Sequence, residues 1–514
     1  MWHFIARELR PNVHKYRYTS VDNSLVSRYV LGPYWNWLVT LFPRWVAPNT
    51  ITLMGLLLVV GNVLSLLYLD HDLENSTRVR AEAQLARPHG GSLPVVPLLH
   101  NAGLPPSLAR PAWRHTASVI PPWLLFVWAV CLFFYQSFDS IDGKQARRTG
   151  MAGPLGEMFD HGCDALNTTF EVLLATSAIG LGRSYFSLML LLSCTINFYL
   201  STWEEYHTHT LFLSAFSGPV EGILITCVVY LMSGLLGGPE ACNRGILTVT
   251  GLERSGWVRE RAAWANWPLN DVVVTLATLG IVYNIVASYS NVIKTCLRDR
   301  RSVVRPLFGL LPLVVQIGAN VAWMEGNAQF IYRHGAAFTA FQLYWGICFA
   351  YMVGLLITAH VCGGAFPHWN VTCVVSLLGA LDAHLPTPLL QRTDAASAYV
   401  VYAALGFSLA LYGYFVYDII TTITAESTSH AAHAKLTSSG EGMLHRLGQA
   451  GHRGQVVTPA PAPAHGTRRP RCAPAPRTPR SHSPRRARSR DPPCRSSARA
   501  AVAPRCCLLY TSPR

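Results

Sequence analysis

Four aspartates with a fixed spacing stand out in a chain that is otherwise mostly apolar. The segment from Asp139 to Asp164 reads DSIDGKQARRTGMAGPLGEMFDHGCD. Its regularly spaced positions are Asp139, Asp142, Gly143, Ala146, Arg147, Gly156, Asp160 and Asp164. If each of these positions matches by chance about once in twenty, a random chain of this length shows the pattern with a probability of roughly one in fifty million. The pattern therefore indicates a specific chemical site.

The spacing suits two helices whose carboxylates meet. Asp139 and Asp142 are three residues apart and Asp160 and Asp164 are four apart, so each pair lies on one face of a helix. Clustered carboxylates near a membrane repel one another unless a cation joins them, and hard divalent cations prefer carboxylate oxygens. The spacing predicts a Mg²⁺ or Mn²⁺ site. The alternative, a solvated acidic loop with helix caps, does not require fixed glycines at these offsets.

The residues between the aspartates suit a phosphate-bearing ligand. Gly143 and Gly156 have no side chains, so a nucleotide or its phosphates can approach the backbone closely. Arg147 offers a planar fork of N–H donors to phosphate oxygens. We therefore expect a nucleotide phosphate to lie beside the metal.

The pattern resembles the signature of the CDP-alcohol phosphotransferase family, integral membrane enzymes that move a phospho-alcohol from a CDP-linked donor to an acceptor and release CMP. All eight signature positions match. The stretches FDHGCDALNTTFE, from Phe159, and WEEYHTHTLFLSAFSGPVEGI, from Trp203, resemble the eukaryotic choline- and ethanolaminephosphotransferase branch. The resemblance extends over residues 18–423.

The resemblance implies a role for each matching residue. The metal would lie among Asp139, Asp142, Asp160 and Asp164, and the CDP moiety would be held by Asp142, Gly143, Ala146, Arg147 and Gly156. Asp164 is one candidate for the general base. His161 is the other, because it is adjacent to Asp160 and its ordinary pKa is much nearer neutrality than that of a carboxyl group.

A second motif, Pro48-Asn49 followed by Thr52 and Gly55, opens the first apolar segment. Polar side chains and free N–H groups at a helix start can bind a phosphate. From spacing alone, a plain helix cap is an equally good interpretation. Similar stretches recur in the family that the signature resembles, so Asn49 and Thr52 are further candidates for CDP binding.

A group of polar residues follows the fourth apolar segment. Glu205 is the candidate contact for the choline or ethanolamine group, although a solvated interfacial segment is the better interpretation of Glu204, Glu205, His207 and His209. The His-x-His lacks further ligands at the spacing of a structural zinc site. Trp203 and Tyr206 could hold a quaternary ammonium, but an aromatic belt at the membrane boundary is commoner. His360, at the end of the eighth segment, is expected to mark the same kind of boundary.

Composition and hydropathy place these motifs in a membrane protein. Half of the residues are hydrophobic, mean hydropathy is +0.25, and only 13% are charged, against roughly 25% in soluble domains. We predict an all-α, polytopic membrane protein with about ten transmembrane helices, a CDP-alcohol phosphotransferase-like helical bundle. The apolar segments are 48–69, 120–138, 163–181, 185–202, 219–236, 272–293, 304–323, 338–360, 371–385 and 398–420.

Charge distribution orients the bundle and divides the chain. Basic residues cluster in the loops after the second and sixth segments, so these loops, and the aspartates with them, are expected on the cytosolic side. The predicted parts are a cytosolic amphipathic segment (1–47), a transmembrane catalytic domain (48–423) with a long lumenal loop (70–118), and a disordered Pro/Arg-rich tail (424–514). Nearly all of the net charge of +15 lies after residue 445, which removes the reason to expect nucleic acid as a partner.

These features predict an enzyme that transfers phosphocholine, phosphoethanolamine or both from the CDP-alcohol to 1,2-diacylglycerol. The expected cofactor is Mg²⁺ or Mn²⁺, and the expected partners are CDP-choline or CDP-ethanolamine, diacylglycerol and membrane lipid, with a second copy of the chain as a further candidate. The expected location is the endoplasmic reticulum membrane, with the Golgi membrane as the alternative. Other open interpretations are a sister enzyme with a different acceptor and a polytopic transporter, which predicts acids buried in mid-membrane and an internal repeat.

Overall fold

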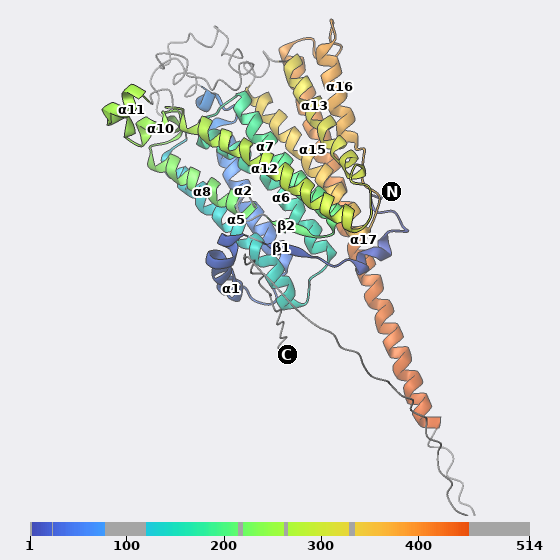
Figure 1. Cartoon of the computed structure of the whole chain (residues 1–514). Helices are drawn as coiled ribbons and strands as arrows, with labels where there is room; N and C mark the ends of the chain where they lie inside the picture. Colours follow the sequence, from blue (N-terminus) through green and yellow to red (C-terminus); the bar gives the residue numbers. More distant parts are fainter. Residues whose placement is uncertain are drawn as a thin grey trace, which may run out of the picture. The chain divides into compact units, whose positions relative to one another are not determined.

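The described part of the chain folds almost entirely into helices (Figure 1). The computed structural model describes residues 3–22, 24–77, 120–213, 219–261, 266–327 and 335–451. The main helices are α1 (Gly32–Leu41), α2 (Pro48–Asp70), α5 (Pro122–Thr149), α6 (Pro154–Ala178), α7 (Tyr185–Thr208), α8 (Pro219–Leu235), α12 (Leu269–Arg298), α13 (Leu311–Gly326), α15 (Gly335–Cys362), α16 (Val371–His384) and α17 (Asp394–Gly451). The short elements are η1 (Arg10–Lys15), β1 (Ser20–Asp22), η2 (Ser27–Leu31), β2 (Leu211–Leu213), α9 (Pro239–Cys242), α10 (Ile246–Val249), η3 (Leu252–Arg254), α11 (Gly256–Arg261) and η5 (Arg305–Leu310).

Each of the ten predicted apolar segments coincides with a helix. Within the described residues, seven helices are long and apolar enough to cross a membrane: α2, α5, α7, α12, η5 joined to α13, α15, and the part of α17 from Asp394 to Ser429. The other three predicted segments correspond to α6, which carries several acidic residues, and to α8 and α16, which have only 17 and 14 residues. The predicted all-α polytopic membrane fold is confirmed.

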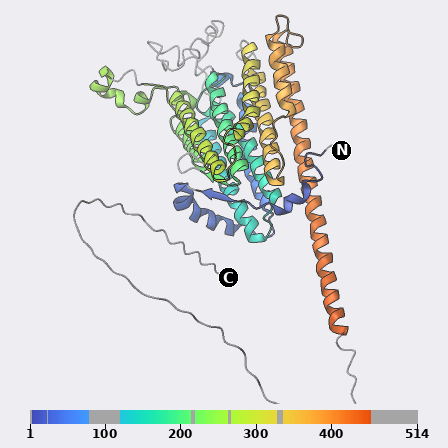
Figure 2. The same ribbon diagram turned by 45° about the vertical axis from the view of Figure 1, so that its right-hand side comes forward.

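Helix α15 is the best-buried element of the bundle. It packs against α6 and α7, and nearly all of its side chains are shielded from the outside. Around it, α2 packs along α5, α5 along α8, α7 along α12, and α13 along α16 (Figures 1 and 2). The outer side of α12 exposes Leu276, Leu279, Val282 and Val286. A continuous apolar surface of this kind is unfavourable in water and suits lipid.

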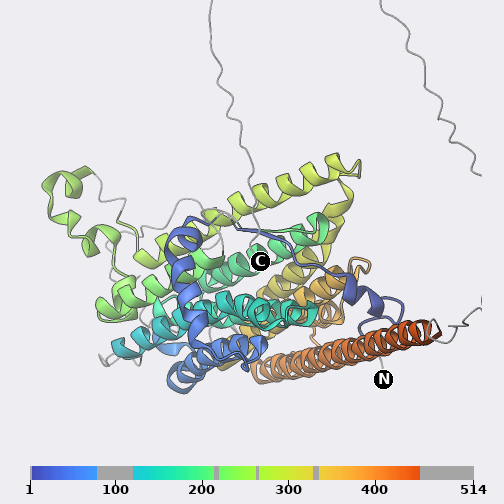
Figure 3. The same ribbon diagram turned by 90° about the horizontal axis from the view of Figure 1, so that it is seen from below.

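The N-terminal segment joins helices that are distant in sequence. The Phe4 N–H donates to Asp418 Oδ2 of α17 at 2.8 Å, and Asn12 Nδ2 donates to the carbonyl of Cys362, at the end of α15, at 3.1 Å. Farther along, β1 pairs in parallel with β2, which follows α7. Figure 3 shows this segment, in dark blue, running between α1 and α17. Residues 4–22 are therefore held against the ends of α7 and α15 and against the middle of α17.

Helix α17 continues beyond the predicted end of the catalytic domain. It covers residues 424–451, for which the sequence predicts disorder. The physical reason is local: this stretch is proline-free, and the first proline that would interrupt a helix after residue 424 is Pro459. Residues 452–514 of the predicted tail and 78–119 of the predicted lumenal loop lie outside the described residues.

Candidate active site

Helices α5 and α6 form a hairpin that carries the whole signature. Gly150 ends α5 with a φ of 72°, which glycine adopts without steric cost, and the Met151 N–H donates to the Ala146 carbonyl at 2.9 Å. Pro154 occupies the first turn of α6, where a missing N–H breaks no helical hydrogen bond. The short turn folds α6 back toward α5, so the two aspartate pairs meet on helices rather than in the loop between them.

The aspartates converge without a protein cation between them. Carboxylate oxygens of Asp139, Asp160 and Asp164 lie within 4.8 Å of one another, and Asp142 is close enough to interact electrostatically with Asp160 and Asp164. The Oδ1 atoms of Asp139 and Asp160 are buried and have no hydrogen-bond partner. Within the described part of the chain, none of the four forms an ion pair with a lysine or arginine. Uncompensated buried carboxylates are unfavourable, so the cluster fits a divalent cation bound by these oxygens.

Two hydroxyl groups hold the carboxylates in place. The Thr52 hydroxyl, from α2, donates to Asp142 Oδ2, and the Tyr135 hydroxyl, one turn before the aspartates on α5, donates to Asp164 Oδ1. Gly55 allows this arrangement, because a Cβ at that position would approach the Tyr135 ring to 3.3 Å. The close packing of α2 on α5 therefore brings Thr52 to the acidic cluster.

The candidate nucleotide-binding residues lie at the same end of the hairpin. A Cβ added to Gly156 would meet only Asn49 Oδ1, at 3.7 Å, so the start of α2 lies beside the start of α6. A Cβ added to Gly143 would meet only Arg147 Nη1, at 3.6 Å. Arg147 is exposed, and Ala146 is half-buried next to it. Neither glycine is needed for helix packing, which leaves the space beside each for a ligand.

His161 and Asp164 differ in what they contact. The Asp164 carboxylate accepts the Tyr135 hydroxyl and belongs to the convergent acidic cluster. His161 is buried, and its ring forms no hydrogen bond with another described residue. Of the two candidate bases, the imidazole is therefore the one without a hydrogen-bond partner among the described residues.

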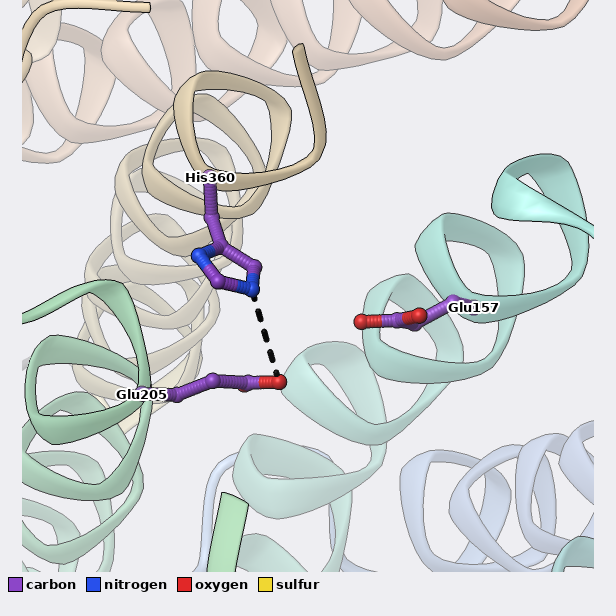
Figure 4. Close-up of side chains that lie close together, drawn as sticks. All are labelled: Glu157, Glu205 and His360. Carbon is purple, nitrogen blue, oxygen red and sulfur yellow. Dashed lines mark ion pairs between the residues drawn. The ribbon is translucent and has the colours of Figure 1, made fainter. Parts of the chain in front are cut away.

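Glu205 lies in a second cluster rather than among the aspartates. Glu157 of α6, Glu205 of α7 and His360 of α15 converge from three helices (Figure 4). The His360 side chain is 6% exposed and faces Glu205, and its place at a membrane boundary stays a prediction. The interpretation of Glu204 and Glu205 as a solvated segment is wrong, since both side chains are buried. Trp203 belongs to no interfacial belt, because it is fully buried.

Comparison with known proteins agrees with the signature. The protein-family model described as CDP-alcohol phosphatidyltransferase matches residues 116–254. An uncharacterised CDP-alcohol phosphatidyltransferase class-I family protein from Schizosaccharomyces pombe is 33% identical, over 82% of this chain and 95% of its own length. The chain belongs to the CDP-alcohol phosphatidyltransferase class-I family. Within this family, the chain is also similar to a choline/ethanolaminephosphotransferase (33% identical) and a cholinephosphotransferase (30%) from Saccharomyces cerevisiae, each over 82% of this chain and 96% of the relative.

The structure of this family member places three residues in the two clusters that the sequence did not assign to them. Tyr135 precedes Asp139 by four residues, so the helical period alone could have placed it beside the aspartates. Glu157 lies inside the signature segment, one turn before Asp160, and could have been found in the same way. No spacing signal links His360 to either residue, because α15 is far away in sequence.

Proposed function

We propose that this chain transfers phosphocholine or phosphoethanolamine from the CDP-alcohol to the free hydroxyl of 1,2-diacylglycerol, with release of CMP. The observation that carries the proposal is the α5–α6 hairpin, which presents four aspartates around buried, unpartnered carboxylate oxygens. The names of the yeast relatives support the choice of these substrates. An alternative acceptor and a transporter have no comparable support.

The residues fit a divalent metal and a diphosphate together. Asp139, Asp142, Asp160 and Asp164 would hold Mg²⁺ or Mn²⁺, with Thr52 and Tyr135 fixing two of the carboxylates. Such a metal neutralises charge on the diphosphate and on the departing CMP. Asn49, Gly143, Ala146, Arg147 and Gly156 would receive the CDP moiety next to it.

His161 is the proposed general base. It accepts the proton of the diacylglycerol hydroxyl while that oxygen forms a bond to the phosphorus that carries the alcohol group. The bond from this phosphorus to the oxygen of CMP breaks, and CMP leaves with the electron pair. Asp164 is less suited to the proton transfer because its carboxylate is engaged by Tyr135 and by the acidic cluster.

The membrane supplies the acceptor. Since diacylglycerol stays in the bilayer, it must reach the hairpin sideways between helices, while the CDP-alcohol comes from the aqueous side. We further propose that this side is the cytosol and that the membrane is that of the endoplasmic reticulum. Association with a second copy of the chain stays a prediction.

Purified protein in lipid-containing micelles is expected to make labelled phosphatidylcholine or phosphatidylethanolamine from the matching labelled CDP-alcohol, diacylglycerol and Mg²⁺. Product and CMP should appear in equal amounts, and omission of diacylglycerol or chelation of the metal should abolish both. Absence of either phospholipid under all of these conditions would refute the proposed function.

Gly156→Ala is expected to weaken CDP-alcohol binding without loss of fold. The added methyl group meets only an ordinary contact with Asn49 but occupies the space proposed for the ligand. We expect KM for the CDP-alcohol to rise roughly tenfold, equivalent to about 1.4 kcal/mol. Gly346→Ala is the contrasting variant, because its Cβ would overlap the Thr169 side chain in the core. Gly346→Ala should lower thermal stability rather than raise KM. If Gly156→Ala lowers stability and Gly346→Ala raises KM, Gly156 does not border the CDP-alcohol.

A further inference from the structure

The second cluster contains one buried carboxylate, of Glu205, and one half-buried carboxylate, of Glu157, that the proposed metal site does not use. One ligand atom each from Glu157, Glu205 and His360 lies within 4.8 Å of the other two. The Tyr16 hydroxyl, from the N-terminal segment, donates to Glu157 Oε1, and the Tyr16 ring meets the His360 ring edge to face at 5.5 Å. Figure 4 shows the three side chains directed toward one another from α6, α7 and α15. The cluster is therefore a site built from four separate parts of the chain.

Glu205 is the least satisfied member of this cluster. Its side chain is 3% exposed, and it accepts no hydrogen bond from another residue that the structure describes. Its closest basic group is His360 Nε2 at 3.8 Å, which is longer than a hydrogen bond. His360 is equally enclosed, and its Nδ1 has no partner. A buried carboxylate in this state is unfavourable unless a cation from outside the chain occupies the space in front of it.

The position of the cluster relates it to the substrate. Glu157 precedes Asp160 by three residues on α6, a rise of about 4.5 Å along the helix. In the phospho-alcohol group of the proposed donor, two carbon atoms separate the phosphate oxygen from the nitrogen, a span of similar size. With the phosphate at the aspartates, the positively charged nitrogen can reach Glu157 and Glu205.

The number and spacing of the acceptors distinguish two kinds of nitrogen. A primary ammonium group has three N–H donors, and tetrahedral geometry with donor–acceptor distances of about 2.9 Å places its acceptors about 4.7 Å apart. Glu157, Glu205 and the neutral His360 ring supply three acceptor atoms within 4.8 Å of one another, which is close to this separation. A trimethylammonium group has no N–H donor and is bound best by open aromatic faces. The two aromatic side chains next to Glu205 in sequence are engaged elsewhere. The Tyr206 hydroxyl donates to the Gly364 carbonyl at 2.9 Å, and its ring packs edge to face against His207 and Phe366. Trp203 is fully buried and donates its indole N–H to the Pro306 carbonyl.

We infer that Glu157, Glu205 and His360 form the head-group pocket and that this pocket selects the primary ammonium of CDP-ethanolamine over the quaternary ammonium of CDP-choline. The inference rests on the proposed function and adds the choice of head group. It also assigns a role to the N-terminal segment, because Tyr16 orients the Glu157 carboxylate that faces the nitrogen.

The test compares kcat and KM for the two CDP-alcohols in the purified full chain and in Glu205→Gln. The wild type should have the higher kcat/KM with CDP-ethanolamine. Glu205→Gln should lower that value at least tenfold, mainly through KM, and should change kcat/KM for CDP-choline by less than threefold. His360→Gln should also lower kcat/KM for CDP-ethanolamine relative to kcat/KM for CDP-choline. Glu204→Gln is the matched control, because Glu204 faces Asn291 of α12 at 2.8 Å, and it should leave the ratio unchanged.

The outcomes separate this inference from the proposed function. If the wild type uses neither CDP-alcohol, the proposed function fails. If the wild type is active but prefers CDP-choline, or if Glu205→Gln affects both donors equally, only the head-group inference is overturned. Metal analysis of the purified chain provides a second criterion: a transition metal that is present in the wild type and lost in Glu205→Gln would identify a metal centre and overturn the ammonium pocket.

Discussion

Asp160→Asn is expected to abolish phospholipid synthesis while leaving the protein at least as stable as the wild type in a metal chelator. Activity should fall by about a thousandfold or more, because metal-assisted charge stabilisation contributes several kcal/mol to such a reaction. Stability should not fall, since Asp160 Oδ1 has no hydrogen-bond partner and the substitution removes one of several mutually repelling carboxylates. Added Mg²⁺ should raise the melting temperature of the wild type more than that of the variant.

Asp382→Asn provides the matched control for a buried aspartate with a structural role. The Asp382 carboxylate accepts backbone N–H groups from Leu389, Leu390 and Gln391 at 2.8 to 3.2 Å. Its replacement should cost about 1–3 kcal/mol of stability, because these donors lose a charged acceptor. Activity per folded molecule and its dependence on Mg²⁺ should persist. Equal loss of activity in both variants, or retention of activity in Asp160→Asn, would contradict the metal site.

His161→Gln is expected to remove most of the chemical rate at every pH. Proton transfer by a positioned base contributes roughly 10²–10⁴-fold, and glutamine can fill the space without accepting the proton. The loss should appear in kcat, with KM for the CDP-alcohol little changed, because the imidazole is assigned to the acceptor hydroxyl rather than to the donor. Measurement requires the full pH profile of the purified variant with saturating diacylglycerol.

The pH profile of Asp164→Asn is the comparison for that of His161→Gln. An asparagine at this position removes a metal ligand and the acceptor of the Tyr135 hydroxyl, so activity should fall together with affinity for Mg²⁺. Higher metal concentration should then restore part of the rate. High pH should not rescue His161→Gln. If alkaline pH restores His161→Gln but not Asp164→Asn, the aspartate is the base and the assignment to histidine is wrong.

The sequence could predict the acidic centre because that centre is local. Asp139 and Asp164 lie on two helices joined by a short turn, so helical periodicity determines which of the residues between them share a face. The apolar segments could be predicted equally well, because hydropathy over a membrane-length window depends on composition alone. The helical region after residue 423 was missed because its polar composition was interpreted together with the proline-rich sequence that follows.

The second cluster could not be predicted from one sequence. Glu205 and His360 are brought together by the packing of α7 on α15, which depends on side-chain shapes along both helices rather than on spacing. Tyr16 reaches Glu157 only because the N-terminal segment is anchored at Asp418 and Cys362. Such contacts require the tertiary structure, since no local rule relates the residues involved.

The different origins of the two clusters affect how the protein can change during evolution. The aspartates lie on one helical hairpin that is braced by Thr52 of α2, so substitutions away from the hairpin and the start of α2 can accumulate without disturbing the metal ligands. Apart from Glu157 on α6, the residues of the second cluster lie on α7, α15 and the N-terminal segment, which are outside the hairpin. Head-group preference can therefore diverge among related chains through a few changes in α7, α15 or the N-terminal segment, while the chemistry of transfer is inherited unchanged.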